Sequence, residues 1–322
     1  MMLSEDKRDW QPACDIDALH ARARLLARTR AFFMARQVIE VETPTLGRAG
    51  AMDPSLHNIT VSATASAGLQ TRYLQTSPEF FMKRLLAAGA GSIYQICKAF
   101  RDGEAGTLHN PEFTILEWYR PDFDHHQLMD EVHELIVEIL GPGAIERLSY
   151  AELFWSCLEI DIDNAEIREL RAAVDQETQA GFGERLDRDE CLDLLVTSVV
   201  SRALREKRTF VYDYPASQAA LARVRPGPPE RAERFELFIN GVELANGFHE
   251  LCDAKEQRRR FEAERARRVA LRLPVSRLDE QLLEALEYGL PNCAGVAIGV
   301  DRLLMLSLNR TRLSDVVAFP CE

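Results

Sequence analysis

The hydrophobic positions of the chain change their spacing several times, and each change predicts a different element. Between residues 16 and 37, Leu19, Leu26 and Phe33 recur about every two turns, with arginines on the opposite side. This spacing predicts an amphipathic helix. The β-branched run that follows, residues 38–43, predicts a short strand that stops at Pro44.

Further along, short alternating segments predict strands that are joined mainly by turns. A hairpin is expected over residues 59–76, and later strands are expected at residues 93–100, 113–119, 210–214, 234–239, 242–251 and from 293. Helices are expected after the Ser77-Pro78-Glu79 start and over residues 124–140, 253–271, 278–288 and from 301. Strands in hairpins without strand–helix alternation predict an α+β fold, an antiparallel β-sheet flanked by helices.

Two regions differ from this pattern. Residues 1–15 look like an N-terminal tail, and residues 148–208 are polar, helical in period and free of strand signals. We expect the second region to be a small helical insertion within a domain that spans residues 16–322.

Composition narrows the class of protein. The net charge of −12 makes a general nucleic-acid binder a poor interpretation, because phosphate backbones favour Lys and Arg. The seven cysteines include no C-x-x-C pair, and the N-terminus has no apolar core for a signal peptide. No apolar run is long enough for a membrane span. These features predict a cytoplasmic protein with reduced thiols and no membrane association.

The most informative stretch is residues 100–120, FRDGEAGTLHNPEFTILEWYR. A strand, a polar loop and a returning strand place Arg101 where its guanidinium can hold a phosphate in a bidentate fork. An isolated loop Arg would be read as a surface residue, but the string from Leu108 to Phe113 is specific. On the returning strand, Glu117 and Tyr119 are two apart and share a face.

A second constellation is the segment from Glu243 to Glu250, ELANGFHE. An odd separation normally places two strand residues on opposite faces, so we expect a bend or bulge at Gly247 that lets the two carboxylates converge. Two carboxylates that face a triphosphate form a natural Mg²⁺ site. The alternative is a solvent-facing acid pair on an edge strand.

Two other segments carry weaker signals. In the segment from Gly295 to Arg302, glycines allow another group to approach the strand closely, and Arg302 could hold the tail of ATP. Core packing explains its apolar residues but not this arginine. His125 and His126 are expected to be solvated residues at a helix start.

Taken together, these segments resemble the class II aminoacyl-tRNA synthetases of the lysine-activating branch. Residues 16–46 look like motif 1, which forms the dimer interface in that class and ends at a proline. Residues 93–120 look like motif 2, and residues 295–308 look like motif 3. Several segments resemble those of the shortened paralogues of lysyl-tRNA synthetase, the elongation factor P–(R)-β-lysine ligases. These segments are TSPEFFMKRLLAAG, HNPEFTILEWYRP and AERFELFINGVELANGFHEL. The chain starts almost directly at motif 1, so no anticodon-binding OB domain is expected.

The resemblance implies a class II synthetase catalytic core, a homodimer, and ATP and Mg²⁺ as cosubstrate and cofactor. It implies activation of (R)-β-lysine, or lysine, and its transfer to elongation factor P, with tRNA as an unlikely acceptor. Arg101 and Arg302 would be catalytic. The lysine-like substrate would contact Ser77, Pro78, Glu79, Tyr119 and Glu250. ATP would contact Arg101, Asp102, Gly103, Asn110, Glu243, Leu244, Gly299 and Arg302, and Mg²⁺ would bind Glu243 and Glu250.

Two departures from the family pattern leave questions open. Motif 2 usually reads Arg-x-Glu, whereas Gly103 stands at the third position here and Glu104 follows it. Either Glu104 takes over through a shifted loop, or backbone makes that contact to ATP. In motif 3, lysyl-tRNA synthetases usually have Gly where this chain has Ala297, and the extra methyl would reshape the amino-acid pocket.

Three alternatives to the ligase remain. The chain could be a minimal lysyl-tRNA synthetase, a catalytically silent paralogue that serves as a binding module, or a ligase that acts on another protein or a small amine. The acidic charge argues against the first, and the presence of Arg101, Arg302 and the acid pair argues against the second.

Overall fold

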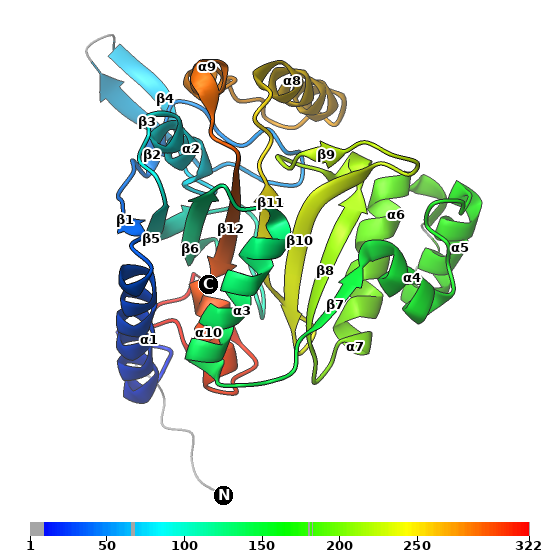
Figure 1. Ribbon diagram of the computed structural model, residues 1–322, viewed down its shortest axis with the longest axis horizontal. Helices are drawn as coiled ribbons and strands as arrows, with labels where there is room; N and C mark the ends of the chain where they lie inside the picture. Colours follow the sequence, from blue (N-terminus) through cyan, green and yellow to red (C-terminus); the bar gives the residue numbers. More distant parts are fainter. Residues whose placement is uncertain (1–9, 66–67, 180, 182, 322) are drawn as a thin grey trace, which may run out of the picture.

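A long, strongly twisted β-sheet organises the molecule (Figure 1). The computed structural model describes residues 10–65, 68–179, 181 and 183–321. In this part of the chain, nine strands form the large sheet in the order β1-β5-β6-β12-β11-β10-β8-β7, with β9 paired to β10. A separate three-stranded sheet has the order β2-β4-β3. The first nine residues, where most of the predicted tail falls, lie outside the described residues.

The strands mostly follow the segments that the sequence predicts. Their bounds are β1 Ile39–Glu40, β2 Leu46–Gly47, β3 Thr60–Ala65, β4 Gly68–Leu74, β5 Ile93–Phe100, β6 Glu112–Pro121, β7 Glu146–Ser149, β8 Arg208–Pro215, β9 Val224–Arg225, β10 Arg231–Ile239, β11 Val242–His249 and β12 Cys293–Gly299. The pairs from β5 to β8 are antiparallel, as expected. At the two sheet edges, β1 pairs with β5 and β7 pairs with β8 in parallel, and the sequence did not predict this.

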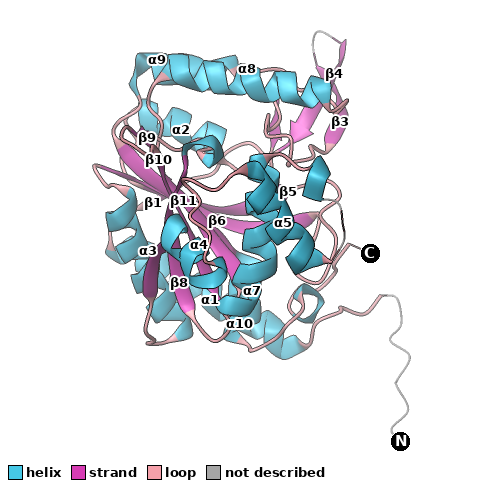
Figure 2. Ribbon diagram, turned by 90° about the vertical axis from the view of Figure 1, so that its right-hand side faces the viewer, coloured by secondary structure: helices cyan, strands magenta, loops and turns pink. Residues whose placement is uncertain are grey.

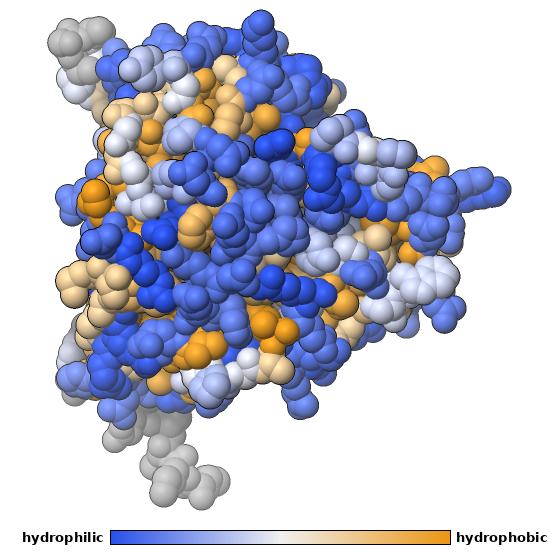
Figure 3. Space-filling model, in the orientation of Figure 1, coloured by the Kyte–Doolittle hydropathy of each residue, from blue (hydrophilic) through white to orange (hydrophobic). Residues whose placement is uncertain are grey.

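Helices pack on one face of the sheet, at one end of it and beyond one of its edges. Their bounds are α1 Ile16–Ala35, α2 Glu79–Ala87, α3 His125–Leu140, α4 Tyr150–Leu158, α5 Ile167–Thr178, α6 Arg188–Leu195, α7 Ser201–Ala203, α8 Ala254–Ala270, α9 Glu280–Gly289 and α10 Val300–Ser307. The helices α1, α3 and α10 pack on one face, and α2, α8 and α9 lie together at one end of the molecule (Figures 1 and 2). The helices α4 to α7 gather beyond the β7–β8 edge and share a second core with strands β8 and β10. None of the helices in the described ranges has the length and apolarity that a bilayer span requires. On the side of the molecule seen in Figure 3, hydrophilic residues cover most of the surface.

Because side chains alternate along a strand, the two faces of the sheet carry different residues and have different roles. On β6, Leu116 and Trp118 point into the core beneath α1, α3 and α10. Their neighbours Glu117 and Tyr119 point to the opposite face, as the period of two predicts. That opposite face, crossed by β6, β12 and β11, is where the functional site is built.

The bulge in β11 is not where the sequence placed it. Across the β10–β11 pair, Leu237 is opposite Ala245 and Phe238 is opposite Glu243, so Leu244 is the extra residue. Pairing continues without interruption through Gly247, so the expected bend there is wrong. The bulge shifts the alternation by one, and Glu243 therefore shares a face with Asn246 and Glu250. Gly247 serves packing instead, because a Cβ there would lie 2.4 Å from Cζ of Phe235.

The expectation that two histidines are solvated at the start of α3 is half wrong. Asp124 caps this helix through a capping box with Gln127. His126 is exposed. His125 is only 2% exposed, because the helix start lies against strands β10 and β11. A helix start can be buried when it packs on a sheet, and local sequence does not reveal this.

Candidate active site

A cavity of about 290 Å³ opens on the face of the sheet opposite α3. Strands β6, β11 and β12, helix α2 and the loop after β5 supply about half of its lining, and residues 47–56 and 73–77 supply much of the rest. Most of the predicted site residues line it, namely Ser77, Glu79, Arg101, Asn110, Tyr119, Glu243, Leu244, Glu250, Gly299 and Arg302. The structure therefore brings together four segments that are far apart in the sequence. Pro78, Asp102 and Gly103 are not part of this lining.

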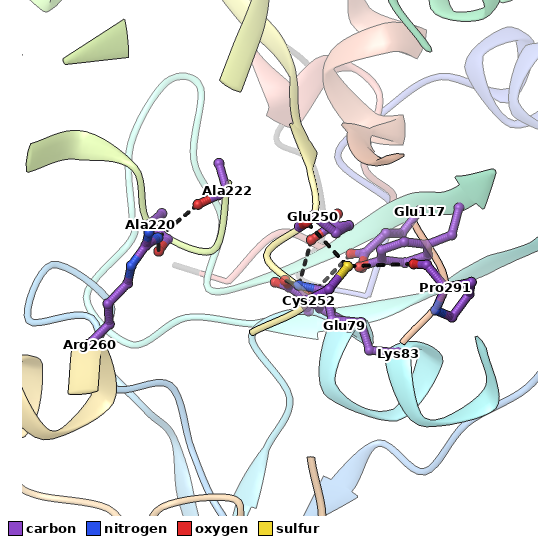
Figure 4. Close-up of polar contacts among 11 residues, drawn as sticks. Glu79, Lys83, Glu117, Ala220, Ala222, Glu250, Cys252, Arg260 and Pro291 are labelled. Carbon is purple, nitrogen blue, oxygen red and sulfur yellow. Dashed lines mark hydrogen bonds and ion pairs between the residues drawn. The ribbon is translucent and has the colours of Figure 1, made fainter. Parts of the chain in front are cut away.

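One end of the cavity is strongly acidic and surrounds a single buried ammonium group. Nζ of Lys83 lies 2.6 Å from Oε1 of Glu79 and 2.5 Å from Oε2 of Glu250 (Figure 4). Glu117 completes the cluster and accepts hydrogen bonds from the hydroxyl of Tyr119 at 2.7 Å and from Oγ of Ser77 at 2.6 Å. Helix α2 supplies Glu79 and Lys83 one turn apart, so the two side chains meet on one helix face.

The protonation of this cluster reflects its excess of acids. Burial raises the pKa of Glu250 to about 8, and it raises the pKa of Glu117 to about 7. Glu79 adds to both shifts, while Lys83 opposes them. Burial by itself would lower the pKa of Lys83, but the facing carboxylates outweigh it and raise that pKa. Lys83 therefore stays charged. Glu117 and Glu250 have pKa values near neutral pH, so they are easily protonated unless another positive charge binds beside them.

Gly295 makes room for this cluster. It lies directly opposite Tyr119 in the β12–β6 pair. A Cβ built on Gly295 would lie 2.2 Å from Cε1 of Tyr119 and 2.6 Å from Oε1 of Glu250. Such contacts are far inside van der Waals distance, so only glycine allows the Tyr119 ring and the Glu250 carboxylate to cross the strand here.

The other end of the cavity presents two arginines. The Arg302 guanidinium donates to the backbone oxygens of Glu243 at 2.7 Å and Leu108 at 3.2 Å. It also donates to Nε2 of His109 at 2.9 Å, which requires a neutral imidazole, and burial together with Arg302 lowers the pKa of His109. These contacts hold Arg302 at the start of α10, and its side chain remains 20% exposed.

Arg101 is less constrained. Its guanidinium lies over the Phe113 ring, 5.1 Å from the centroid, and its NH1 is 3.6 Å from Oε1 of Glu104. Its buried Nε has no hydrogen-bond partner. Phe113 is four residues from Glu117 on the same strand, so roughly 13 Å of strand separates the cationic end from the acidic end.

The loop after Arg101 bears on the unusual motif 2. Asp102 and Gly103 are exposed, and the backbone N–H of Asp102 donates to the oxygen of His57 at 2.9 Å. Glu104 lines the cavity instead and contacts Arg101. This arrangement favours the shifted-loop interpretation. Asn110 lines the cavity, but its Oδ1 also accepts from the backbone N–H of Cys321 at 2.8 Å, which holds the C-terminal segment.

The two predicted Mg²⁺ ligands lie in different surroundings. The Glu243 carboxylate is 45% exposed, lines the cavity and lies 3.9 Å from NH1 of Arg302. It is free to accept a hydrated cation beside a phosphate, which is the way Mg²⁺ is usually held. The Glu250 carboxylate is 1% exposed and is paired with Lys83. The donor set therefore fits a metal at Glu243, and Glu250 fits better as a ligand for an ammonium group.

Sequence reasoning missed two members of the site. Glu117 was placed on the correct face, but it was not assigned a role. Lys83 went unnoticed, although its position four residues after Glu79 is a signal for an ion pair on one helix face. Its partner Glu250 is 167 positions away, and that contact could not be read from local sequence.

Comparison with known proteins agrees with this geometry. The family model described as tRNA synthetases class II (D, K and N) matches residues 15–322. This chain belongs to that family. The class II relatives include a protein of Proteus mirabilis that is 50% identical over 319 residues, covering 97% of each chain. Another, from Vibrio vulnificus, is 47% identical over 316 residues, covering 97% of this chain and 98% of its own. Both are named elongation factor P–(R)-β-lysine ligase.

Proposed function

We propose that this protein is an ATP-dependent ligase that activates (R)-β-lysine as an adenylate and transfers it to the ε-amino group of a lysine on elongation factor P. In the first step, a carboxylate oxygen of the substrate bonds to the α-phosphorus of ATP, and pyrophosphate leaves with the electrons of the broken bond. In the second step, the acceptor amine attacks the acyl carbon, AMP leaves and the amine loses a proton. Membership of the class II synthetase family supports ATP as the cosubstrate.

The observation that carries the proposal is the charge of the acidic end. Three carboxylates, Glu79, Glu117 and Glu250, surround one ammonium group, that of Lys83. When all four are ionised, an excess of two negative charges remains in a buried site. Uncompensated buried charge is costly. A diamino acid brings two ammonium groups, and an analogue that lacks one would leave a carboxylate unpaired, so the site selects for both.

The cationic end supports the activation step. Arg101 and Arg302 face the part of the cavity where a triphosphate would lie, and Arg302 is held in place by backbone carbonyls. Catalysis of this kind needs positioning and charge stabilisation rather than a side-chain nucleophile. We assign Mg²⁺ to Glu243, where the bound ion would offset phosphate charge. Glu250, the other predicted ligand, we assign to the substrate.

The identity of the amino acid rests on a smaller feature. Ala297 lies directly opposite Glu117 in the β12–β6 pair and lines the cavity. Its methyl group therefore lies at the floor of the amino-acid site, where a glycine would leave more space. We infer that this methyl favours a substrate whose amine is displaced by one carbon from the position in α-lysine.

Pyrophosphate exchange tests the activation step. We expect ATP–pyrophosphate exchange that depends on (R)-β-lysine and is slower with lysine, and no exchange with a monoamino acid of the same length. Glu117→Gln should slow the exchange by about 100-fold, because one ammonium contact is lost. Glu112→Gln on the same strand is the matched control, since Glu112 is exposed and contacts only Lys98 among basic groups of the described residues. Exchange that ignores the diamino acid, or equal loss in both variants, would contradict the proposal.

The acceptor needs its own measurement. The names of the relatives support elongation factor P, and this acceptor places the reaction in the cytoplasm. After incubation with ATP and (R)-β-lysine, we expect the intact mass of elongation factor P to rise by one β-lysyl group. Acid gels of tRNA from the same reaction should show no charging. Charged tRNA with unmodified elongation factor P would favour a minimal lysyl-tRNA synthetase.

We also propose a homodimer through motif 1. Met34 on α1 is 76% exposed, Ile39 on the edge strand β1 is 56% exposed, and Leu46 is 40% exposed. An apolar helix end beside an unpaired strand edge is a surface that a second copy can cover. Sedimentation equilibrium should give twice the chain mass, and Met34→Lys should shift the protein toward monomer. A wild-type protein that stays monomeric at micromolar concentration would contradict this.

A further inference from the structure

A second cluster of ionisable side chains lies on the α3 face of the sheet, directly behind the acidic end of the cavity. It contains His125 at the start of α3, Glu233 on β10 and His249 on β11. One ligand atom from each of the three lies within 4.8 Å of the others, and among the residues that the structure describes this is the only group of its kind. The three residues are 2%, 8% and 7% exposed. His249 directly precedes Glu250 of the proposed active site.

The polar atoms of this cluster are poorly satisfied. Neither ring nitrogen of His125 has a hydrogen-bond partner. Nδ1 of His249 lies 2.7 Å from Oε2 of Glu233, yet neither atom makes a hydrogen bond. Buried polar groups without partners are costly, and native proteins nearly always satisfy them. A group that accepts electron pairs from all three side chains would remove the deficit.

We propose that His125, His249 and Glu233 bind a divalent transition-metal ion, with Zn²⁺ as the best fit to these donors. Two imidazoles and one carboxylate are a recurrent Zn²⁺ ligand set. Metal–ligand bonds of about 2.1 Å would place the ligand atoms roughly 3.4 Å apart around a tetrahedral ion. Side-chain rotation would therefore have to separate Nδ1 of His249 from Oε2 of Glu233, now 2.7 Å apart, and bring the more distant atoms closer.

The side chains around the three proposed ligands are also compatible with a bound metal ion. Nε2 of His249 lies 2.8 Å from Oδ1 of Asn292, which would fix this ring and leave Nδ1 for the ion. Nε2 of His125 lies 3.8 Å from Oδ1 of Asp213, which is beyond hydrogen-bond distance. A small shift of the ring would let this carboxylate orient a metal-bound imidazole. Arg225 donates to the other oxygen of Asp213 at 2.6 Å and balances that charge.

The position of the cluster gives the ion a structural task. It would join α3 to β10 and β11, and it would fix the residue next to Glu250. The site is buried and has no access from the cavity side, because it lies on the opposite face of β11. A structural rather than catalytic ion follows from this, and Mg²⁺ at Glu243 would be separate from it.

Metal binding to the full-length protein tests the proposal. After removal of metals with a chelator, the protein is titrated with Zn²⁺ in excess Mg²⁺ against a chromophoric competitor. We expect one tightly bound Zn²⁺ per chain, and we expect the affinity to fall by more than about tenfold in His125→Gln and in His249→Gln. His126→Gln is the matched control, because His126 neighbours His125 but is exposed. It should retain the site.

Cobalt supplies a readout that does not depend on the variants folding. Co²⁺ added to the metal-free wild-type protein should give the visible bands of a four- or five-coordinate nitrogen and oxygen site, without a thiolate charge-transfer band. Zn²⁺ should also raise the melting temperature of the wild type and of His126→Gln, but not of His125→Gln. No stoichiometric Zn²⁺ in the wild type, equal binding in all variants, or a thiolate band from one of the cysteines would overturn the proposal.

Discussion

Nζ of Lys83 lies 2.5 Å from Oε2 of Glu250, and both side chains are almost fully buried. This contact joins helix α2 to the end of β11 across the floor of the cavity. Lys83→Met would remove the cation and leave three carboxylates without a positively charged partner. Removal of one member of a buried ion pair costs about 3–5 kcal/mol. We expect a loss of that size in the free energy of unfolding, measured in urea at pH 8.5.

Lys98→Met is the control for this variant. Lys98 lies 3.3 Å from Glu112, but both side chains are about half exposed. An exposed ion pair contributes less than about 1 kcal/mol, so this variant should be close to wild type. Equal free energies of unfolding for the two variants would show that the buried ion pair does not stabilise the folded protein.

The raised pKa values of Glu117 and Glu250 predict how activity depends on pH. In the free protein, burial raises these pKa values to about 7 and about 8. The ammonium groups of the substrate need ionised carboxylates, so kcat/KM for (R)-β-lysine should rise between pH 6 and pH 8.5 and fall once the substrate amines lose protons. Glu117→Gln should remove the lower part of the rise. A flat profile over this range would contradict the assignment.

The same shifts predict the opposite trend in stability without substrate. A carboxyl group whose pKa is raised by folding stabilises the folded state fully below its unfolded value, near 4.5. That contribution is lost as the pH rises through about 7 for Glu117 and about 8 for Glu250. The melting temperature of the free protein should therefore fall from pH 6 to pH 8.5, and the stabilisation by (R)-β-lysine should grow, both measured by calorimetry.

Gly295→Ala should disturb the substrate end of the cavity. The new methyl would lie 2.2 Å from the Tyr119 ring and would press on Glu250. We expect a loss of about 1–3 kcal/mol in the free energy of unfolding. The KM for the amino acid should rise more than the KM for ATP. Gly299→Ala is the stability control, since its Cβ would meet Arg302 at an ordinary 3.7 Å. Similar stability losses in the two variants would contradict the close-approach argument.

Ala297→Gly should change the choice of substrate. The variant removes the methyl group opposite Glu117 and leaves the charged groups in place. One methyl in a binding pocket is worth about 10- to 200-fold in discrimination. We expect the ratio of kcat/KM for lysine to that for (R)-β-lysine to rise by at least about tenfold in pyrophosphate exchange. An unchanged ratio would place the discrimination elsewhere in the cavity.

Arg101→Lys should weaken the nucleotide end without unfolding the protein. Lysine keeps the charge but loses the planar fork and the contact over Phe113. We expect a drop of about 100-fold in exchange rate with little change in melting temperature. Arg48→Lys, at an exposed position outside the cavity lining, should match wild type. Activity of Arg101→Lys near the wild-type level would remove Arg101 from the proposed mechanism.

Much of the fold and the site could be predicted because the signals are local. The alternation on β6 placed Glu117 and Tyr119 on one face, and the strands expected at residues 234–239 and 242–251 correspond to β10 and β11. The resemblance to class II synthetases gathered segments that are distant in the sequence, and ten of the thirteen residues assigned by it line one cavity.

What the sequence did not predict depends on tertiary contacts. The parallel pairing of β1 with β5 joins residues more than 50 positions apart, and no local pattern encodes it. The burial of His125 and the pairing of Lys83 with Glu250 depend in the same way on which elements meet. The bulge was misplaced because glycine is a common bulge residue, whereas this strand accommodates its extra residue at Leu244.

The position of that bulge has a consequence for how this site can vary. One extra residue in the strand, Leu244, determines that the side chain of Glu243 lies on the same face of the sheet as that of Glu250. A regular strand over the same seven-residue separation would turn Glu243 toward α3 while leaving Glu250 where it is. Nucleotide and amino-acid chemistry can therefore each be altered by substitution, but their mutual orientation depends on the bulge being kept.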